Sequence, residues 1–570
     1  MAAIIADNII SPLGSSSGAN YQAVKAGKTA LRLHNHKFNL PFPFTAALFS
    51  EEQKEEFTID GLTLFESLAV TSIRKALEGC QIPLDSRTCL VLSSTKQNIS
   101  LLNIEGNPPE NVLYPGRSAE RIAQTVGLST TPIIVCNACI SGVSALILGN
   151  RLIEMQEYDY VIVCGIDLQS SFIISGFHSL KALSETPCRP FDIERTGLNL
   201  GEAAATVILG KVSQTDRWNI AGSAIRNDAY HVSSPAPKAD GCLMTLEAVM
   251  KGQDASKLSV INAHGTATLY NDQMEARGIC RAGLSDIPVN ALKGYYGHTM
   301  GAAGILETII TLHAAEDDTI VGTKGYEEVG VSGNLNIVRN NTATAKKDFV
   351  KLISGFGGCN AAVLLTPSTP LEGVKGQEIE TLHKVTITPQ SVLIDNEVID
   401  TGQQTGKALL TYLYKTYIQD YPKFYKMDAL ARLGFIATEL LIQKEQEKRG
   451  KEQEAGSERA VIFFGQSSSI NADKEFLASI ADPENFFPSP ASFVYTLPNI
   501  VNGEVAIRNN YHGETAFYIL PRKDDDMMRM ITQATMLDNY HKSILTGWLD
   551  YRNEEDFLAE LRIENYEGCD

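Results

Sequence analysis

Short apolar runs alternate with stretches of helix length through residues 1–366. Two of these runs, Pro132–Cys136 and Tyr160–Cys164, flank the amphipathic stretch Ser141–Glu157. Runs of isoleucine and valine without polar alternation are typical of strands that are covered on both faces. The pattern therefore predicts an α/β fold, with helices packed against both sides of its sheets.

The text changes near residues 367–380 to a mixture of Pro, Ser, Gly and Lys, which predicts a linker. A second module, residues 381–570, follows. A shift of 383 positions reveals an internal repeat without a gap, and the alternative is an unrelated α/β domain. The shift lays Ile122–Ala123 on Val505–Ala506, 133–135 on 516–518, and 161–167 on 544–550.

Composition narrows the class of protein. A chain of 570 residues with 44% hydrophobic and 20% charged residues is globular, with three or four folding units expected. The formal net charge of −18 disfavours binding to nucleic acid or to an anionic membrane. The N-terminal text has no basic start and no apolar run long enough for a signal sequence or membrane span, so we expect a cytoplasmic location. Ten scattered cysteines predict reduced thiols.

The strongest chemical signal is Cys139, in the text Cys136-Asn-Ala-Cys-Ile-Ser-Gly142. An apolar strand here runs through a turn of small residues into a helix, which is the pattern of a nucleophile elbow. A helix N-terminus favours the thiolate, so we expect an ionised, reactive sulfur. One alternative is a small cysteine buried behind a strand. Another is a redox or zinc Cys-X-X-Cys, although no second pair has metal-ligand spacing.

Two histidines occupy similar positions further along the chain. His264 ends the apolar run that begins at Val260, and His298 follows the glycine turn in the text Leu292–Gly304. A lone histidine at a strand end is more often a hydrogen-bonded structural residue. Together with Cys139, however, the two imidazoles favour a covalent mechanism that uses a thiol nucleophile.

Four motifs in this order resemble β-ketoacyl synthases of the Cys-His-His type. They are Asn137–Gly142, Ala263–Glu275, Lys293–Gly304 and Gly355–Asn360, supported by Ile9–Gly14 and by the text from Cys188 to Glu202. The resemblance spans about residues 1–366. It implies a thiolase-like duplicated α-β-α-β-α fold, with an N-terminal half at 1–210 and a C-terminal half at 211–366. Such enzymes work as dimers on acyl carrier protein thioesters.

The resemblance also implies roles for single residues. Cys139 would be the acylated nucleophile, and His264 and His298 would bind the malonyl thioester carbonyl. The backbone amides of Cys139 and Phe356 would form a second oxyanion site. The remaining assignments are a gate at Phe356, an ion pair of Lys293 with Glu275, substrate contacts at Thr266 and Thr268, and structural support at Asn360. No metal or free cofactor is implied, because phosphopantetheine on the carrier protein holds the substrates.

Three positions depart from the family pattern. Gly201-Glu-Ala-Ala-Ala205 has alanine in place of two of the usual glycines, and Ser354 stands where many members carry phenylalanine, so helix packing and the shape of the acyl pocket are expected to differ. Cys359 lies near the second catalytic cysteine of thiolases, but we interpret it as a small core residue.

The second module resembles the N-terminal half of a ketosynthase without its other half. The 383 shift puts Arg522 at the nucleophile position, so we expect no catalysis there. A half of this fold would expose an apolar face, and we expect it to dock on the first module or on another protein.

The predicted function is a 3-oxoacyl-(acyl-carrier-protein) synthase of fatty acid, polyene or polyketide biosynthesis. The expected assembly is a homodimer or a heterodimer with a chain-length-factor-like protein. The alternatives are a CoA-dependent thiolase and a non-catalytic scaffold or chain-length partner.

Overall fold

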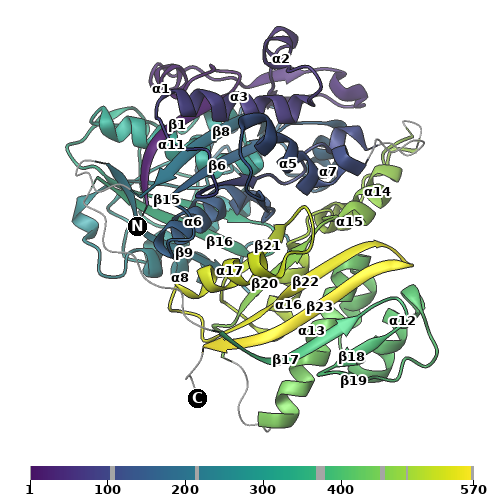
Figure 1. The fold of residues 1–570 in the computed structure, drawn as a ribbon. Coiled ribbons are helices and arrows are strands. Elements are labelled where there is room, and N and C mark those ends of the chain that lie inside the picture. Colours follow the sequence, from purple (N-terminus) through teal and green to yellow (C-terminus); the bar gives the residue numbers. More distant parts are fainter. Residues whose placement is uncertain are drawn as a thin grey trace.

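The computed structural model describes residues 2–102, 110–211, 217–367, 379–449, 456–482 and 485–566. Residues 368–378, most of the predicted linker, lie outside the described residues. Two large sheets form the centre of the described part of residues 2–366, and one of them continues into the C-terminal module, drawn in green and yellow (Figure 1). Within the described chain, no helix is both long enough and apolar enough to cross a membrane.

The first sheet has the strand order β1-β8-β6-β4-β5. Its central strands run parallel, and β8 is antiparallel to both of its neighbours. All positions of β5 and all but the first of β6 are buried, as the apolar runs at 132–136 and 160–164 predicted. The bounds are β1 (Ala3–Ile10), β4 (Thr88–Ser93), β5 (Ile133–Val135), β6 (Tyr160–Asp167) and β8 (Ala203–Gly210).

The second sheet lies behind a shared layer of two helices. Its order is β9-β16-β15-β10-β11-β13. The helices α6 (Ser141–Glu154) and α11 (Ala303–Glu316) pack against strands of both sheets. The strand bounds are β9 (Trp218–Asn227), β10 (Leu258–Asn262), β11 (Pro288–Asn290), β13 (Asn336–Ile337), β15 (Asp348–Gly355) and β16 (Cys359–Thr366).

Two further helix layers complete the first module. On the first sheet lie α3 (Leu64–Glu78) and α5 (Pro115–Val126), and α3 starts with a capping box of Thr63 and Glu66. On the second sheet lie α8 (Asp240–Val249) and α9 (Leu269–Arg281). The layers therefore follow the order α-β-α-β-α, and the predicted fold class is confirmed.

Shorter elements connect these layers. The helices are α1 (Ser17–Lys25), α2 (Glu51–Phe57), α4 (Glu110–Leu113), α7 (Ser171–Ser179) and α10 (Lys293–Tyr296). The short strands are β2 (Arg32–His34), β3 (Phe44–Ala47), β7 (Leu200–Gly201), β12 (Thr319–Ile320) and β14 (Thr342–Ala343).

The C-terminal module repeats the first sheet in the order β21-β20-β22-β23-β17. The 383 shift lays β5 on β21 and β6 on β22, so the internal repeat is confirmed. The strand bounds are β17 (Ile379–Ile387), β18 (Val392–Ile394), β19 (Glu397–Val398), β20 (Ala460–Gly465), β21 (Thr515–Ile519), β22 (Ser543–Asn553) and β23 (Asp556–Tyr566).

The helices of the C-terminal module follow the same repeat. Under the shift, α5 corresponds to α16 and α6 to α17. The equivalent residues Asp167 and Asp550 each accept hydrogen bonds from backbone amides after the first parallel strand of their sheet. The helix bounds are α12 (Gly406–Leu413), α13 (Ala429–Arg449), α14 (Ile470–Ala478), α15 (Pro490–Tyr495), α16 (Ile500–Asn509) and α17 (Asp525–Met536).

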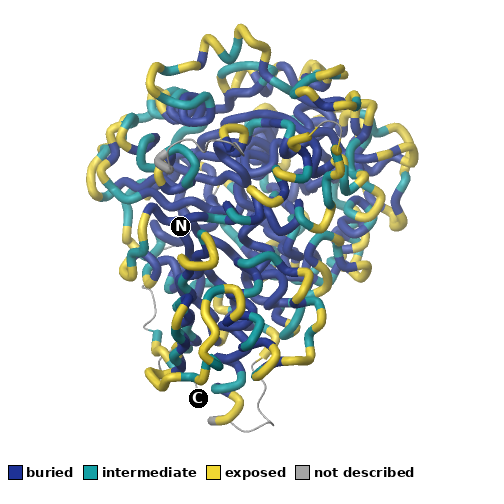
Figure 2. Tube along the Cα trace, turned by 90° about the vertical axis from the view of Figure 1, so that its right-hand side faces the viewer, coloured by how far each residue is buried: buried dark blue, intermediate teal, exposed yellow. Residues whose placement is uncertain are grey.

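The two modules join edge to edge. Strand β21 pairs antiparallel with β5, with Tyr518 opposite Val135 and Ile519 opposite Ile134. Next to this edge α17 packs on α6, and side chains of both modules share one apolar cluster. Figure 2 shows buried residues in both modules and along the region where they meet. The prediction that the half module docks on the first module is confirmed.

The part of the C-terminal sheet beyond this contact is polar. On β17 and β23 one face is apolar, whereas the other carries Lys384, Glu560 and Arg562. Lys384 and Lys523 both pair with Glu560 at 2.8 Å. Charged positions therefore replace the apolar contacts that a second half would make, and this explains how half of the fold tolerates solvent.

Candidate active site

The predicted nucleophile elbow lies at the C-terminal end of β5. Cys139 occupies a short 3₁₀ turn that leads directly into α6, and Ala138 before it has φ +48°, a left-handed conformation that is unusual for alanine. Ser141 fixes the turn, because its Oγ accepts from the Asn137 amide at 2.8 Å and donates to the Ala138 carbonyl at 2.6 Å. The backbone thus presents Cys139 at the edge of the sheet.

The structure brings Cys139, His264 and His298 together. The Cys139 Sγ and one ring nitrogen from each histidine lie within 4.8 Å of one another. The two imidazole rings are 5.0 Å apart between centroids and are inclined by 81°. All three residues line a cavity of about 360 Å³. A thiol and two imidazoles from three distant parts of the chain therefore share one reaction space.

Both imidazoles are neutral. Burial lowers the pKa of His264 and of His298 well below the ordinary histidine value, and the nearby ammonium of Lys293 acts in the same direction. The Met300 amide donates to His298 Nδ1 at 3.3 Å, so the proton of the neutral ring sits on Nε2. Within the described chain, that Nε2 and the Nδ1 of His264 have no hydrogen-bond partner. The Nε2–H of His298 is therefore a buried hydrogen-bond donor without an acceptor among the described residues.

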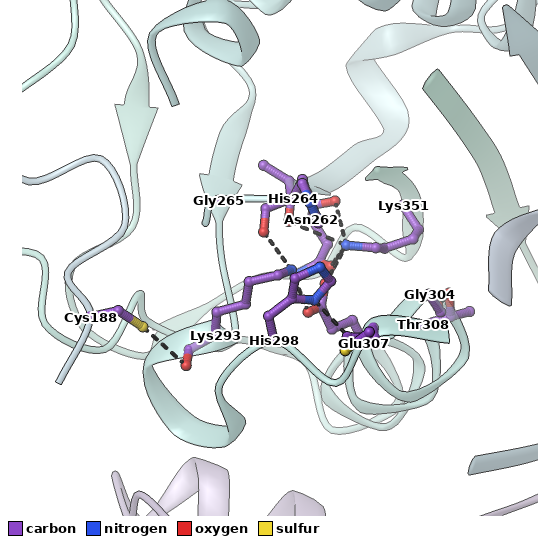
Figure 3. Close-up of polar contacts among 12 residues, drawn as sticks. Cys188, Asn262, His264, Gly265, Lys293, His298, Gly304, Glu307, Thr308 and Lys351 are labelled. Atoms are coloured by element: carbon purple, nitrogen blue, oxygen red, sulfur yellow. Dashed lines mark hydrogen bonds and ion pairs between the residues drawn. The ribbon is translucent and has the colours of Figure 1, made fainter. Parts of the chain in front are cut away.

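The expected ion pair of Lys293 with Glu275 is wrong. Lys293 instead pairs with Glu307 at 2.8 Å and donates to the His264 carbonyl at 2.6 Å (Figure 3). Glu275 turns to the backbone and accepts from the amides of His264 and Gly265 at 2.6 and 2.7 Å. Burial and the neighbouring Asp272 raise its pKa to about 7. Glu275 thus supports the strand end that carries His264, through the main chain.

The other predicted residues line or brace the cavity. Thr266 and Thr268 face it and share a hydrogen bond of 2.9 Å between their hydroxyls. Phe356 stacks on Phe177, with ring centroids 6.2 Å apart. Asn360 accepts from Ser354, the departure from the family pattern, at 2.7 Å and so ties the loop 354–360 together. Serine at this position therefore forms a polar brace.

The C-terminal module reaches the same loop. Asn499 donates to the Phe356 carbonyl at 2.8 Å. Next to it, Cys359 is buried and its thiol donates to the Phe356 carbonyl at 3.1 Å. Burial raises the pKa of Cys359, so this second sulfur carries a proton and acts as a packing residue.

Cys139 differs from the expectation of an ionised sulfur. Burial raises the pKa of its thiol to about 12, against the smaller opposing effects of Lys293 and of the backbone amides of Cys139 and Phe356. The cost of desolvating a thiolate exceeds what the helix terminus returns. The resting protein therefore holds a thiol, and the backbone amides of Cys139 and Phe356 face its sulfur.

This protonation state predicts the pH dependence of alkylation. Because the raised pKa keeps the thiolate fraction small, the rate of Cys139 modification by iodoacetamide should rise about tenfold for each pH unit between pH 7 and 9. Peptide mass spectrometry measures the rate at this residue, with Cys139→Ala as the blank. A rate that is already constant from pH 7 would contradict a raised pKa.

Sequence reasoning missed three residues of the site. Glu307 lies in an otherwise apolar helix, Lys351 in an apolar strand, and Asp167 at the end of β6, where it accepts from the Gly301 amide at 2.7 Å. A charged residue inside an apolar run is the signal that could have found them, since a buried charge requires a partner.

Among the residues that the structure describes, two groups of side chains have the spacing of metal ligands. One is Cys139 with the two histidines, and the other is Glu514, Asp538 and His541. The ammonium of Lys293 bonds the backbone of the first group and opposes a cation. In the second, Arg151 and Arg226 already neutralise both carboxylates. Neither group fits a metal ion.

Both halves of the first module match known proteins. The family models for the N-terminal and C-terminal domains of β-ketoacyl synthase match residues 4–215 and 218–327. The 3-oxoacyl-(acyl-carrier-protein) synthase 2 of Coxiella burnetii is 28% identical over 63% of this chain and 96% of its own length. A tetracenomycin polyketide synthase ketoacyl synthase alpha subunit of Streptomyces glaucescens is 32% identical over 44% of this chain and 63% of its own length.

One solved structure matches the fold of the whole chain. The structure titled PfaC keto synthase–chain length factor aligns with a TM-score of 0.75 at 14% identity, over 100% of this chain and 78% of its own. The C-terminal module is thus part of a known arrangement of this fold. With both family models covering residues 4–327 almost without a gap, the chain belongs to the β-ketoacyl synthase family.

Proposed function

We propose that this protein is a 3-oxoacyl-(acyl-carrier-protein) synthase that condenses an acyl thioester with a malonyl thioester by decarboxylation. One observation carries the proposal: a thiol at a helix N-terminus shares a cavity with two neutral imidazoles, and the Nε2 hydrogen of His298 is buried without a partner among the described residues. Stabilising an enolate requires such donors and a dry site.

The first step transfers the acyl group. The Cys139 sulfur attacks the carbonyl carbon of the acyl thioester, and the amides of Cys139 and Phe356 stabilise the resulting oxyanion. The carbon–sulfur bond to the carrier breaks, and the departing phosphopantetheine sulfur leaves as a thiol with the proton that Cys139 gives up. Because both sides of this exchange are thioesters, the step needs no external energy source.

The second step forms the carbon–carbon bond. Ring N–H groups of His264 and His298 donate to the malonyl thioester oxygen while the carboxylate leaves as CO₂. The electron pair of the broken bond forms the enolate, which attacks the acyl carbon on Cys139. The Cys139 sulfur then leaves as a thiolate with the electrons of its thioester bond and takes up a proton from solvent, so a 3-oxoacyl thioester is released.

The C-terminal module serves this reaction as a fixed partner. The position equivalent to the nucleophile is occupied by Arg522, an exposed residue that cannot act as a thiol nucleophile. Asn499 holds the Phe356 loop, and β21 occupies the sheet edge beside the elbow. We infer a role like that of a chain-length factor, built into the chain, with an acyl carrier protein as the partner that delivers both substrates.

Acyl loading tests the proposal. The protein is incubated with an acyl carrier protein that bears a C8 thioester, and the modified peptide is identified by mass spectrometry. We expect an acyl mass on Cys139, its absence in Cys139→Ala, and its retention in Cys359→Ser, the neighbouring thiol. Addition of malonyl carrier protein should remove the label as a 3-oxoacyl product. An unmodified Cys139 with a competent donor present would overturn the proposal.

A further inference from the structure

A second lysine lies buried beneath the two histidines. Lys351 is on β15, in the apolar run Phe349–Ile353, and its side chain is fully buried. Its Nζ donates to Asn262 Oδ1 at 2.8 Å and to the Ala263 carbonyl at 3.2 Å, and it pairs closely with Glu307 (Figure 3). The mechanism proposed above does not use this residue.

Two ammonium groups share one carboxylate at this position. Lys293 takes Oε1 of Glu307 and Lys351 takes Oε2. The trio therefore carries one net positive charge in a buried place. Burying a charge that is not fully compensated lowers the free energy of unfolding. Burial lowers the pKa of Lys351 to about 8, although Glu307 opposes the shift, so the ammonium form prevails at pH 7.

The two lysines hold consecutive carbonyls of one strand end. Lys351 binds the carbonyl of Ala263, and Lys293 binds that of His264. Glu275, on α9, holds the amides of the same segment from the other side. The charged groups that face Lys351 are thus Glu307 on α11, Lys293 on α10 and Glu275 on α9, with the two imidazoles above them.

We propose that Lys351 is a second positioning lysine, which fixes the strand end that carries His264 and, with Lys293, adds to the effect of burial in keeping both imidazoles neutral. Neutrality matters for the geometry of His298. A second ring proton would sit on Nδ1, opposite the Met300 amide that donates to that atom, and would break the contact that orients Nε2–H. The catalytic role of this arrangement rests on the proposed function, whereas its effect on the charge of the imidazoles does not.

The test replaces Lys351 by methionine, which has a similar length and no charge. Histidine labelled with ¹³C at Cε1 reports the titration of His264 and His298 by NMR. Removing a nearby positive charge favours the protonated ring, so we expect both midpoints to rise by about one pH unit. The acidic limb of malonyl thioester decarboxylation should rise with them. Lys351→Arg should restore the midpoints, because it keeps the charge.

Controls separate this role from a general loss of structure. Lys347→Met removes a half-buried lysine four residues earlier, which pairs with Asp318, and should leave the midpoints unchanged. Unmoved midpoints in a folded Lys351→Met would overturn the proposal, as would midpoints that Lys351→Arg fails to restore. If Lys351→Met does not fold, Lys351→Gln and Lys351→Arg are compared in its place. Shifted midpoints in an enzyme that never decarboxylates malonyl thioesters would sink the proposed function and leave the role of Lys351 intact.

Discussion

Replacing His298 by alanine is expected to lower the rate of malonyl thioester decarboxylation by about 10²- to 10³-fold, while Cys139 still takes up an acyl group. The reason lies in the unpartnered Nε2–H of His298, which has its acceptor only when the thioester oxygen develops charge. Acyl transfer depends instead on the amides next to Cys139. Release of ¹⁴CO₂ from labelled malonyl carrier protein measures the first rate, and the acyl mass on Cys139 measures the second.

A matched control is His36→Asn, since His36 is exposed and its left-handed backbone suits asparagine. It should leave both rates unchanged. His264→Ala should resemble His298→Ala, because both rings face the same cavity. If His298→Ala lost acylation and decarboxylation to the same degree, the division of labour between imidazoles and amides would be wrong. Unaltered decarboxylation would remove His298 from the reaction.

The sequence was sufficient to predict which residues meet at the site. Cys139, His264 and His298 each follow an apolar run and precede a helix or turn of small residues. Cys139 follows β5 of the first sheet and His264 follows β10 of the second, so a shared sheet edge does not bring them together. The four motifs that resemble those of β-ketoacyl synthases predicted that these residues meet. The strand pattern alone places each residue at the end of an element and does not specify which other residues it will meet.

Which carboxylate pairs with Lys293 could not be predicted in the same way. Glu275 and Glu307 both lie on helices near Lys293 in sequence, and only packing decides that α11 presents Glu307 to it while α9 turns Glu275 to the main chain. The predicted ionisation of Cys139 is wrong for a related reason. The sequence shows that a helix begins after Cys139, which lowers the pKa of the thiol. The larger effect of desolvation, which raises this pKa, depends on all the residues packed around the sulfur, and the sequence does not show them.

The second module shows the same limit at the scale of the fold. Its repeat could be read at a shift of 383 because the segments that follow α16 have the lengths of those that follow α5. The sequence could not show that β21 pairs with β5, because the residues of an edge strand do not specify which strand it pairs with. With that edge filled from within the chain, a second copy has no free strand there to pair with.

The largest stability effect is expected at the contact between the modules. Arg151 on α6 pairs with Glu514 at 2.8 Å, and both side chains are at most 4% exposed. Arg151→Met would leave Glu514 charged, buried and without its guanidinium, so the free energy of unfolding should fall by about 3–5 kcal/mol. Urea denaturation followed by far-UV circular dichroism measures the change.

The exposed ion pair between the same modules supplies the control. Arg522 faces Glu120 at 3.8 Å with a side chain that is 65% exposed, and Arg522→Ala should cost less than about 1 kcal/mol. The double variant Arg151→Met, Glu514→Met removes both buried charges and should recover much of the loss, because the penalty of Arg151→Met arises from the stranded carboxylate. If the double variant were as unstable as the sum of its single substitutions, the coupling energy between Arg151 and Glu514 would be zero, and the stranded carboxylate would not be the source of the loss. If Arg151→Met cost no more than Arg522→Ala, the buried ion pair would contribute little, and the apolar packing of α6 on α17 together with the β5–β21 ladder would have to hold the modules together.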